Sequence, residues 1–581
     1  MASIDSILRL DENAIYSNFA QNPQVLLNHL VDIALLLSSV LLIYVSCLGW
    51  GALTIKYVVK KEGEISPAIT TWAGVLVIAS LTELSNFFWP IDWKVSALTI
   101  LIGSIGAFSN LKNANEYWDR TALIAPTEIG GIWKLLILIA IFTYCSKTLY
   151  IPLAGDNMLY HFNTIKWINE YPIIPGLGNL HGRLAFNQIY FEIIALANFY
   201  PYWMHGTGTI NFFFLTLTIV TVLQINKTEI PNAQIFTIGF LWAALRYSDS
   251  LPTSNSNYFI SLLQVSISAL TLLVLYSRNE NFKPLYFIFL WVCAFSVMAK
   301  FSSGVFASLS VLITLPTAYS KLKKEKLWLL FALAFSVAIY LIHALRGYIL
   351  SGYPLYPSTL GGIDYFEWSM PIGEVIAEYQ WVLSWSRAPG LSPQQVLKNH
   401  DWINTWLINF PFYYWVIFGL SAACIAALAL KWLTIKPPEN KKLLLIIPAI
   451  GSIVFWFFTA PSLGYIGVVP EILLTYLIWA LLGPSSLMII NKKRRVITLL
   501  LALTMWVYAM KTVGVKKISL SGWQELDARP LAIHKTTSGL KILQPITGDQ
   551  CGDSEIPCTP YLNPNLRLIN TDEIRAGFSQ K

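Results

Sequence analysis

The sequence predicts an all-α polytopic membrane protein, and three observations lead to that fold class. Of the 581 residues, 55% are hydrophobic and only 12% are charged, and the mean hydropathy is +0.55. Apolar runs of about 20 residues, the length that an α-helix needs to cross a bilayer, recur along the chain. The 22 Trp and 28 Tyr residues suit helix ends that lie at the level of the lipid headgroups. This composition excludes a soluble enzyme of the same length.

About fourteen runs are long and apolar enough to be transmembrane helices. They lie near residues 31–54, 67–90, 94–110, 132–151, 204–224, 232–245, 257–276, 284–300, 303–319, 327–350, 408–432, 443–460, 466–490 and 496–513. We expect residues 1–131 to form extra N-terminal helices, residues 132–513 to form the main transmembrane module, and residues 514–581 to form a small extracytoplasmic tail.

The positions of lysine and arginine predict how these helices are oriented. More than half of the 40 basic residues lie in short connections, which alternate regularly with longer polar segments. Because short basic loops stay in the cytoplasm, the longer segments must face outside. These external segments are residues 1–30, 152–203, 351–407 and 514–581. We interpret the apolar run 184–200 as a helix along the outer interface, because another span there would invert every later loop.

The charge and motif content of the chain narrows its function. The net charge of +8 reports membrane topology and does not indicate nucleic acid. Nucleotide binding is not indicated either, since the chain lacks a GxxxxGK[ST] P-loop and a GxGxxG turn after a strand. An enzyme whose polar surface lies outside must find an activated substrate there, and lipid-linked donors are available at that surface. Topology therefore favours a lipid-linked substrate.

Two of the six cysteines stand apart from the others. Cys551 and Cys558 lie in the polar tail beside Gly552 and Pro557, whereas the other four lie in apolar runs. In an oxidising compartment this pair could close a small loop as a disulfide. The spacing of cysteine and histidine indicates no structural zinc site.

Several motifs resemble the GT-C superfamily of polytopic glycosyltransferases. The first external loop of that superfamily carries an acidic residue followed by two interfacial helices, and Gly155-Asp156-Asn157 followed by Tyr160-His161 and Lys166-Trp167-Ile168 looks like that loop. Further motifs resemble a related group of bacterial membrane proteins. They are Lys300-Phe301-Ser302-Ser303-Gly304, Ser351-Gly352-Tyr353-Pro354-Leu355-Tyr356-Pro357-Ser358, Thr459-Ala460-Pro461 and Leu562-Asn563-Pro564-Asn565-Leu566-Arg567. The resemblance covers residues 132–581, and it implies a GT-C-like arrangement of the membrane helices.

The resemblance implies a membrane glycosyltransferase of the bacterial plasma membrane with its active site facing outside. Such an enzyme moves a sugar from a polyprenyl-phosphate-linked donor to a glycan, lipid or protein acceptor. Asp156 would be the catalytic base that takes the proton of the acceptor hydroxyl. As an alternative, Asp156 only caps the following helix, since Asp at a helix start satisfies free backbone N–H groups. The superfamily often has paired acids in this loop, whereas here Asn157 follows Asp156.

Cations are needed to stabilise the phosphate that leaves. We expect Lys300 and Arg346 to supply them, with Arg183 and Arg246 as further candidates. Lys300 and Arg346 lie at the outer ends of apolar runs, where an ionisable residue is costly and tends to be functional or paired. The alternative for both is that they snorkel to the lipid headgroups.

Three residues of the first external loop complete the expected substrate-binding set, namely His161, Lys166 and His181. The histidines could orient an acceptor, ligate a divalent metal beside Asp156, or form hydrogen bonds within the loop. The chain offers no HxxxH or DxD spacing for a metal, so no cofactor is firmly expected.

Other functions stay open from the sequence. A polysaccharide polymerase or ligase also acts on lipid-linked sugars, but it transfers a preassembled glycan. A transporter or flippase of lipid-linked sugars would place ionisable residues near the middle of the membrane, whereas the predicted spans carry almost none and Glu83 lies towards the outer end of its run. A scaffold without catalysis would use the tail to bind a partner.

Overall fold

Helices make up most of the protein. A computed structural model describes residues 23–59, 65–110, 131–149, 155–228, 230–276, 281–434, 443–482, 530–570 and 573–581. Within these residues, 8 helices are long and apolar enough to cross a membrane. These spans are Leu27–Tyr57, Pro67–Asn86, Gly206–Asn226, Ser256–Tyr276, Phe282–Ala299, Phe301–Lys321, Lys326–Ser351 and Phe412–Leu433. The chain is therefore an integral membrane protein whose transmembrane part is helical.

The long helices follow the predicted spans closely. They are α3 (Pro23–Tyr57), α4 (Pro67–Asn86), α5 (Trp93–Asn110), α7 (Gly131–Thr148), α10 (Gly206–Leu223), α11 (Ala233–Arg246), α12 (Ser256–Tyr276), α13 (Phe282–Ala299), α14 (Gly304–Lys321), α15 (Lys326–Ser351), α19 (Phe412–Thr434), α21 (Ile447–Phe458) and α23 (Val469–Leu482). Each overlaps one predicted run, while the last predicted run, 496–513, lies outside the described residues. The count of about fourteen spans stays a prediction.

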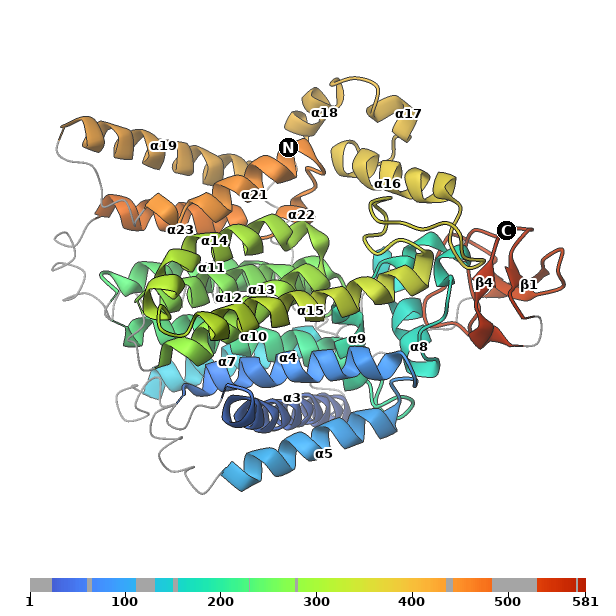
Figure 1. The fold of residues 1–581 in the computed structure, drawn as a ribbon, viewed down its shortest axis with the longest axis horizontal. Helices are drawn as coiled ribbons and strands as arrows, with labels where there is room; N and C mark the ends of the chain where they lie inside the picture. Colours follow the sequence, from blue (N-terminus) through green and yellow to red (C-terminus); the bar gives the residue numbers. More distant parts are fainter. Residues whose placement is uncertain are drawn as a thin grey trace.

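The polar segments gather at one end of the helical bundle (Figure 1). This end holds α8 (Phe162–Glu170), α9 (Ile189–Ala197) and α16 (Ile372–Arg387), with the short helices α17 (Pro393–Val396), α18 (Trp402–Ile408) and α22 (Leu463–Ile466). The strands β1 (Leu531–Lys535), β2 (Lys541–Pro545), β3 (Arg567–Leu568) and β4 (Phe578–Ser579) lie there too, as the antiparallel pairs β1–β2 and β3–β4. Three segments far apart in the sequence are thus neighbours at one end of the bundle.

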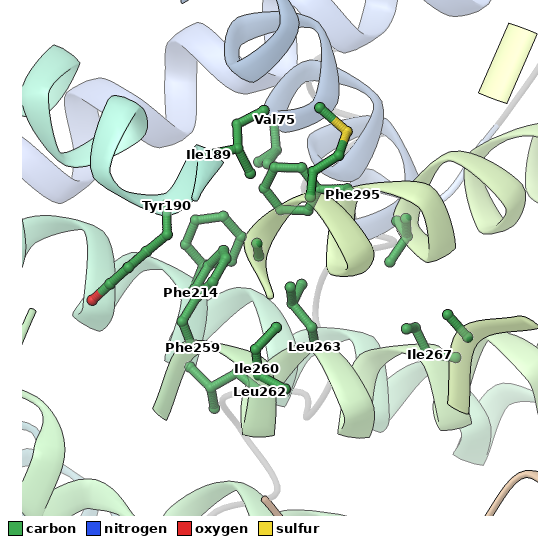
Figure 2. Packing of buried hydrophobic residues seen from close by; sticks show 14 of the residues in the cluster. Val75, Ile189, Tyr190, Phe214, Phe259, Ile260, Leu262, Leu263, Ile267 and Phe295 are labelled. Carbon is green, nitrogen blue, oxygen red and sulfur yellow. The ribbon is translucent and has the colours of Figure 1, made fainter. Parts of the chain in front are cut away.

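The apolar core is built from aromatic side chains of four helices (Figure 2). Tyr190 of α9 stacks on Phe259 of α12, with ring centroids 4.6 Å apart. Phe214 of α10 meets Phe259 edge to face, also at 4.6 Å, and Phe295 of α13 packs against both. The Tyr190 hydroxyl donates a hydrogen bond to Asn211 at 2.6 Å, which satisfies its one polar atom.

The structure corrects one detail of the first polar loop, residues 155–203. The sequence suggests a single interfacial helix over residues 184–200, but only Ile189–Ala197 is α-helical, and all nine residues are buried. A helix of this length rises only about 14 Å, which is too short to cross a bilayer. It packs between α8, α4 and α10 instead of lying on the surface. It is therefore a buried helix that does not span.

Glycine lets the N-terminal helices pack closely. Gly74 of α4 lies against the backbone carbonyl of Cys47 in α3, and Gly49 of α3 lies against the backbone of Gly103 in α5. A Cβ atom at either Gly74 or Gly49 would overlap that backbone. Small residues give membrane helices this close approach, where packing replaces the hydrophobic effect as the driving force.

This packing predicts opposite effects for two glycine-to-alanine changes. Gly74→Ala should lower the thermal unfolding temperature of the protein in detergent, since the backbones of α3 and α4 must separate, with a cost of about 1–3 kcal/mol. Gly419→Ala in α19 is the matched control, because nothing lies within 4 Å of the added methyl group. Alanine favours a helix over glycine by about 1 kcal/mol, so the control should be neutral or stabilising. Equal unfolding temperatures for the two variants would contradict the close packing.

Candidate functional site

Asp156 lies near the start of the first polar loop, residues 155–203, and turns its carboxylate towards Arg183. Gly155 has a left-handed backbone, with φ at +65°, and Asp156 then precedes a π-helical turn over Asn157–His161. The Asp156 side chain makes no capping hydrogen bond among the described residues. It is half exposed and forms an ion pair with the Arg183 guanidinium at 3.2 Å. The carboxylate therefore lies open at a charged site and does not cap the turn.

Arg183 joins this loop to the second polar loop, residues 351–407. Its Nε lies 3.6 Å from an oxygen of Glu378 in α16, and its guanidinium lies over the Tyr160 ring at 5.7 Å. The Glu378 side chain is only 19% exposed. Burial raises the pKa of Glu378, and the charge of Arg183 opposes that rise. One guanidinium thus lies between two carboxylates from different loops.

Sequence analysis did not single out Glu378. A signal was present, because Glu374 and Glu378 are four residues apart and fall on one face of a helix in a polar segment. That spacing is common on solvated helices, so only the contact with Arg183 distinguishes Glu378. Partners distant in sequence could not be assigned from one chain.

Lys300, at the junction of two membrane helices, supplies a second cation. It is an extended residue between α13 and α14, and its ammonium donates to the Asn257 side chain and lies 4.5 Å from the centre of the Tyr465 ring. Burial lowers the pKa of Lys300 to about 8, and the negative charge of Asp156 opposes that fall. The Ser303 hydroxyl donates to the Lys300 carbonyl at 3.0 Å, which fixes this turn.

His161 and Asn157 hold the loop in place. The Asn157 amide oxygen accepts hydrogen bonds from the backbone N–H and the hydroxyl of Ser254, at 2.9 and 2.8 Å. His161 Nδ1 lies 3.2 Å from the Ser254 hydroxyl. Burial, with Lys300 and Arg183 nearby, lowers the pKa of His161 to about 3. His161 is thus a neutral structural partner at pH 7. Asn157 acts as a hydrogen-bond acceptor, whereas the GT-C loops that the sequence resembles often have an acid next to the first one.

His181 precedes Arg183 by two residues, and its side chain is buried. Its ring meets the Tyr561 ring edge to face at 5.5 Å. Burial, together with the charge of Arg183, lowers the pKa of His181 to about 3. His181 is therefore neutral and close to the charged site, where it packs against Tyr561.

Lys166 attaches the C-terminal segment, residues 530–581, to the loop. Its ammonium donates to the Asp553 carbonyl at 3.0 Å and lies 3.7 Å from the Asp553 carboxylate. A disulfide joins Cys551 to Cys558 around that residue, with a Cα–Cα distance of 6.1 Å. The partners of Lys166 are thus protein groups away from Asp156.

Arg346 lies in a separate buried cluster inside the bundle. It forms an ion pair with Glu192 of α9 at 3.1 Å, and it donates to the side chains of Asn187 and Asn86 at 2.7 and 3.3 Å. Three protein groups therefore hold a guanidinium that we expected to contact phosphate. Arg346 positions α15 against α9 and α4.

The same cluster contains the one group of side chains, among the described residues, whose geometry could hold a metal. The donor atoms of Glu83, Glu192 and His343 lie within 4.8 Å of one another. His343 Nδ1 lies 2.7 Å from Glu83, and Arg346 is paired with Glu192. Glu192 is already paired with Arg346 and Glu83 with His343, so the set fits a network of paired side chains better than a dication site.

Arg246 belongs to a third cluster. It forms an ion pair with the buried Glu471 of α23, and its guanidinium lies 3.9 Å from the centre of the Tyr413 ring and 4.6 Å from that of Tyr414. These contacts join α11, α19 and α23. Arg246 is therefore enclosed by protein groups.

Of the predicted site residues, the structure brings together five and separates the others from them. The five are Asp156, His161, His181, Arg183 and Lys300.

The neutral histidines predict how stability depends on pH. The unfolded chain binds a proton at each histidine near pH 6.5, whereas His161 and His181 resist protonation in the folded state down to about pH 3. The unfolded state then binds more protons, so stability should fall as the pH drops below 6.5, by at most about 1.4 kcal/mol per pH unit for each histidine.

Thermal unfolding of the detergent-solubilised protein between pH 7 and 4 checks this expectation. His181→Asn should flatten the pH dependence, since the buried titrating group is gone. His400→Asn is the control, because His400 is exposed and its removal should leave the slope unchanged. A slope that His181→Asn leaves unaltered would show that His181 titrates normally in the folded protein.

Comparison with known proteins adds one family. A family model described as a domain of unknown function, DUF8201, matches residues 33–469. No curated protein and no solved structure matches the chain. The matched range includes Asp156, Arg183, Lys300 and Glu378, and it excludes the C-terminal segment. Because the match covers more than half of the chain, this protein belongs to the DUF8201 family.

Proposed function

We propose that this protein is a membrane glycosyltransferase that moves a sugar from a polyprenyl-phosphate-linked donor to a glycan, lipid or protein acceptor. The observation that carries the proposal is the ion pair between Asp156 and Arg183, with the Lys300 ammonium close enough for the charge of Asp156 to act on its pKa. A half-exposed carboxylate beside two cations suits a reaction in which a proton leaves an acceptor and negative charge develops on a phosphate.

The proposed reaction exchanges one bond of the sugar for another. The acceptor oxygen forms a bond to the anomeric carbon while the bond from that carbon to the donor phosphate breaks. Asp156 takes the proton of the acceptor hydroxyl, and polyprenyl phosphate leaves with the bonding electron pair. Arg183 and Lys300 stabilise the charge on that phosphate, because a guanidinium and an ammonium both bind phosphate oxygens well.

Glu378 is a second acid in this reaction scheme. Burial raises its pKa above that of an ordinary glutamate, while the nearby charge of Arg183 opposes the rise. Its contact with Arg183 also holds the guanidinium towards Asp156. We assign the base to Asp156, which is the more exposed of the two, and a positioning role to Glu378.

The membrane arrangement belongs to the same proposal. We propose a GT-C-like module over residues 132–513, about fourteen spans in all, and a site that faces outside the bacterial plasma membrane. The gathering of the polar loops and the C-terminal segment at one end supports a single-sided site. A lipid-linked donor can then reach the site along the helices, with its phosphate at the headgroup level.

The first test replaces the base. Asp156→Asn keeps the shape of the side chain and removes its charge, so we expect product formation to fall by at least about 100-fold. The measurement compares lipid-linked glycans and surface polysaccharide in a gene-deletion strain that carries wild-type or variant protein at equal membrane levels. Asp364→Asn is the matched control, since this aspartate is exposed in the second loop. Wild-type glycans from the Asp156→Asn strain would disprove the assignment.

A second measurement separates transfer from transport. The purified protein in liposomes should form a new glycosidic bond when supplied with lipid-linked donor and acceptor extracted from the host. Movement of the lipid-linked sugar across the bilayer without a new bond would support a flippase instead. Transfer of an intact, preassembled glycan would support a polymerase or ligase.

A further inference from the structure

The C-terminal segment is bound to the first polar loop along much of its length. The Gly552 N–H donates to the Met158 carbonyl at 2.7 Å, two residues after Asp156. The Phe578 N–H donates to the Pro175 carbonyl at 2.9 Å, and the Phe578 ring meets Trp167 edge to face at 5.9 Å. Backbone hydrogen bonds near the middle of the segment and near its C-terminus fix it against the loop that carries the site.

The same segment also holds the second polar loop. Arg567 forms an ion pair with Glu367 at 3.0 Å, and the Ser579 hydroxyl donates to the Glu367 carbonyl at 2.8 Å. The Lys581 ammonium donates to the Phe366 carbonyl at 3.1 Å. The segment therefore bridges the two loops whose side chains, Asp156 and Glu378, meet at Arg183.

This bridge places one exposed ring beside the charged site. Tyr561 is 57% exposed, packs edge to face on His181, and interacts electrostatically with Arg183 and Glu378. His181 and Arg183 are separated only by Gly182, where an added Cβ would fall 2.8 Å from the Tyr356 hydroxyl. The largely exposed Tyr561 ring thus lies against His181, two residues before the Arg183 whose guanidinium contacts Glu378.

We infer that Tyr561, Arg183 and Glu378 form the subsite that binds the sugar ring of the acceptor, an inference that rests on the proposed function. A pyranose presents C–H groups on one face and hydroxyls around its rim. The C–H face suits the electron-rich face of Tyr561, and the hydroxyls suit the charged groups of Arg183 and Glu378. The Arg183 guanidinium has five N–H donors, so it can contact both substrates: the acceptor hydroxyls on its Glu378 side, and the donor phosphate on its Asp156 side, towards Lys300.

The subsite assigns part of the acceptor specificity to the C-terminal segment. The family match ends at residue 469, so Tyr561 lies outside the matched range, while Arg183 and Glu378 lie inside it. Arg183 and Glu378, inside the matched range, would bind the hydroxyls of the sugar. The Tyr561 ring, in the C-terminal segment, would select the shape of the sugar.

Tyr561 variants test the inference through the dependence of the rate on acceptor. Membranes from the deletion strain that carry each variant are supplied with donor lipid and with increasing amounts of lipid extract from the deletion strain, which contains the unmodified acceptor. Tyr561→Ala should raise the half-saturating amount of extract about tenfold, with the maximal rate little changed. Tyr561→Phe should behave as wild type, since it keeps the ring.

Matched controls distinguish the possible failures. Tyr365→Ala removes a ring that is 87% exposed in the second loop, and it should leave both parameters unchanged. If Tyr561→Ala has the same half-saturating amount and maximal rate as Tyr365→Ala, while Asp156→Asn is inactive, the subsite is overturned and the proposed function stands. A loss of maximal rate at unchanged saturation also overturns the subsite, because Tyr561 would then position other groups. An active Asp156→Asn protein overturns the proposed function and the subsite together.

Discussion

The Arg183 guanidinium is the contact on which the arrangement of the site depends. It bridges Asp156 of the first polar loop and Glu378 of the second, and the charge of Asp156 also acts on the pKa of Lys300. Two carboxylates and two cations balance each other, so partial burial of all four groups is tolerated. Without Arg183, the two acids would repel each other and the loops would lose their shared partner.

Ion pairs inside the bundle support this end of the protein. Glu192 pairs with Arg346 and so joins α9 to α15, while Glu83 pairs with His343 and joins α4 to the same helix. Loss of one partner from a buried pair costs about 3–5 kcal/mol, because a charge is left without compensation. The helix α9 follows directly after the turn with Arg183, so the pair of Glu192 with Arg346 also anchors the end of that turn. Residues that resemble substrate ligands in the sequence act here as supports.

The C-terminal segment depends on the loops as much as they depend on it. Its strands form only two-stranded sheets of two or five residues, which are marginal by themselves in water. A disulfide and the contacts with the first and second loops supply the rest of its stability. The segment therefore depends on its contacts with the two loops for its fold, and these same contacts link the two loops beside the site.

The sequence by itself determined the membrane character, the positions of the long helices, the polar first loop with Asp156 and the cysteine pair, because apolar runs of fixed length and local composition decide these features. Of the candidate site, it identified Asp156, Arg183 and Lys300 as chemically suitable groups. Only the tertiary structure decided which cations meet Asp156 and which, such as Arg346 and Arg246, are held by Glu192 and Glu471. It alone revealed Glu378 and Tyr561, since contacts between loops hundreds of residues apart depend on how the helices pack, and no local pattern encodes that packing.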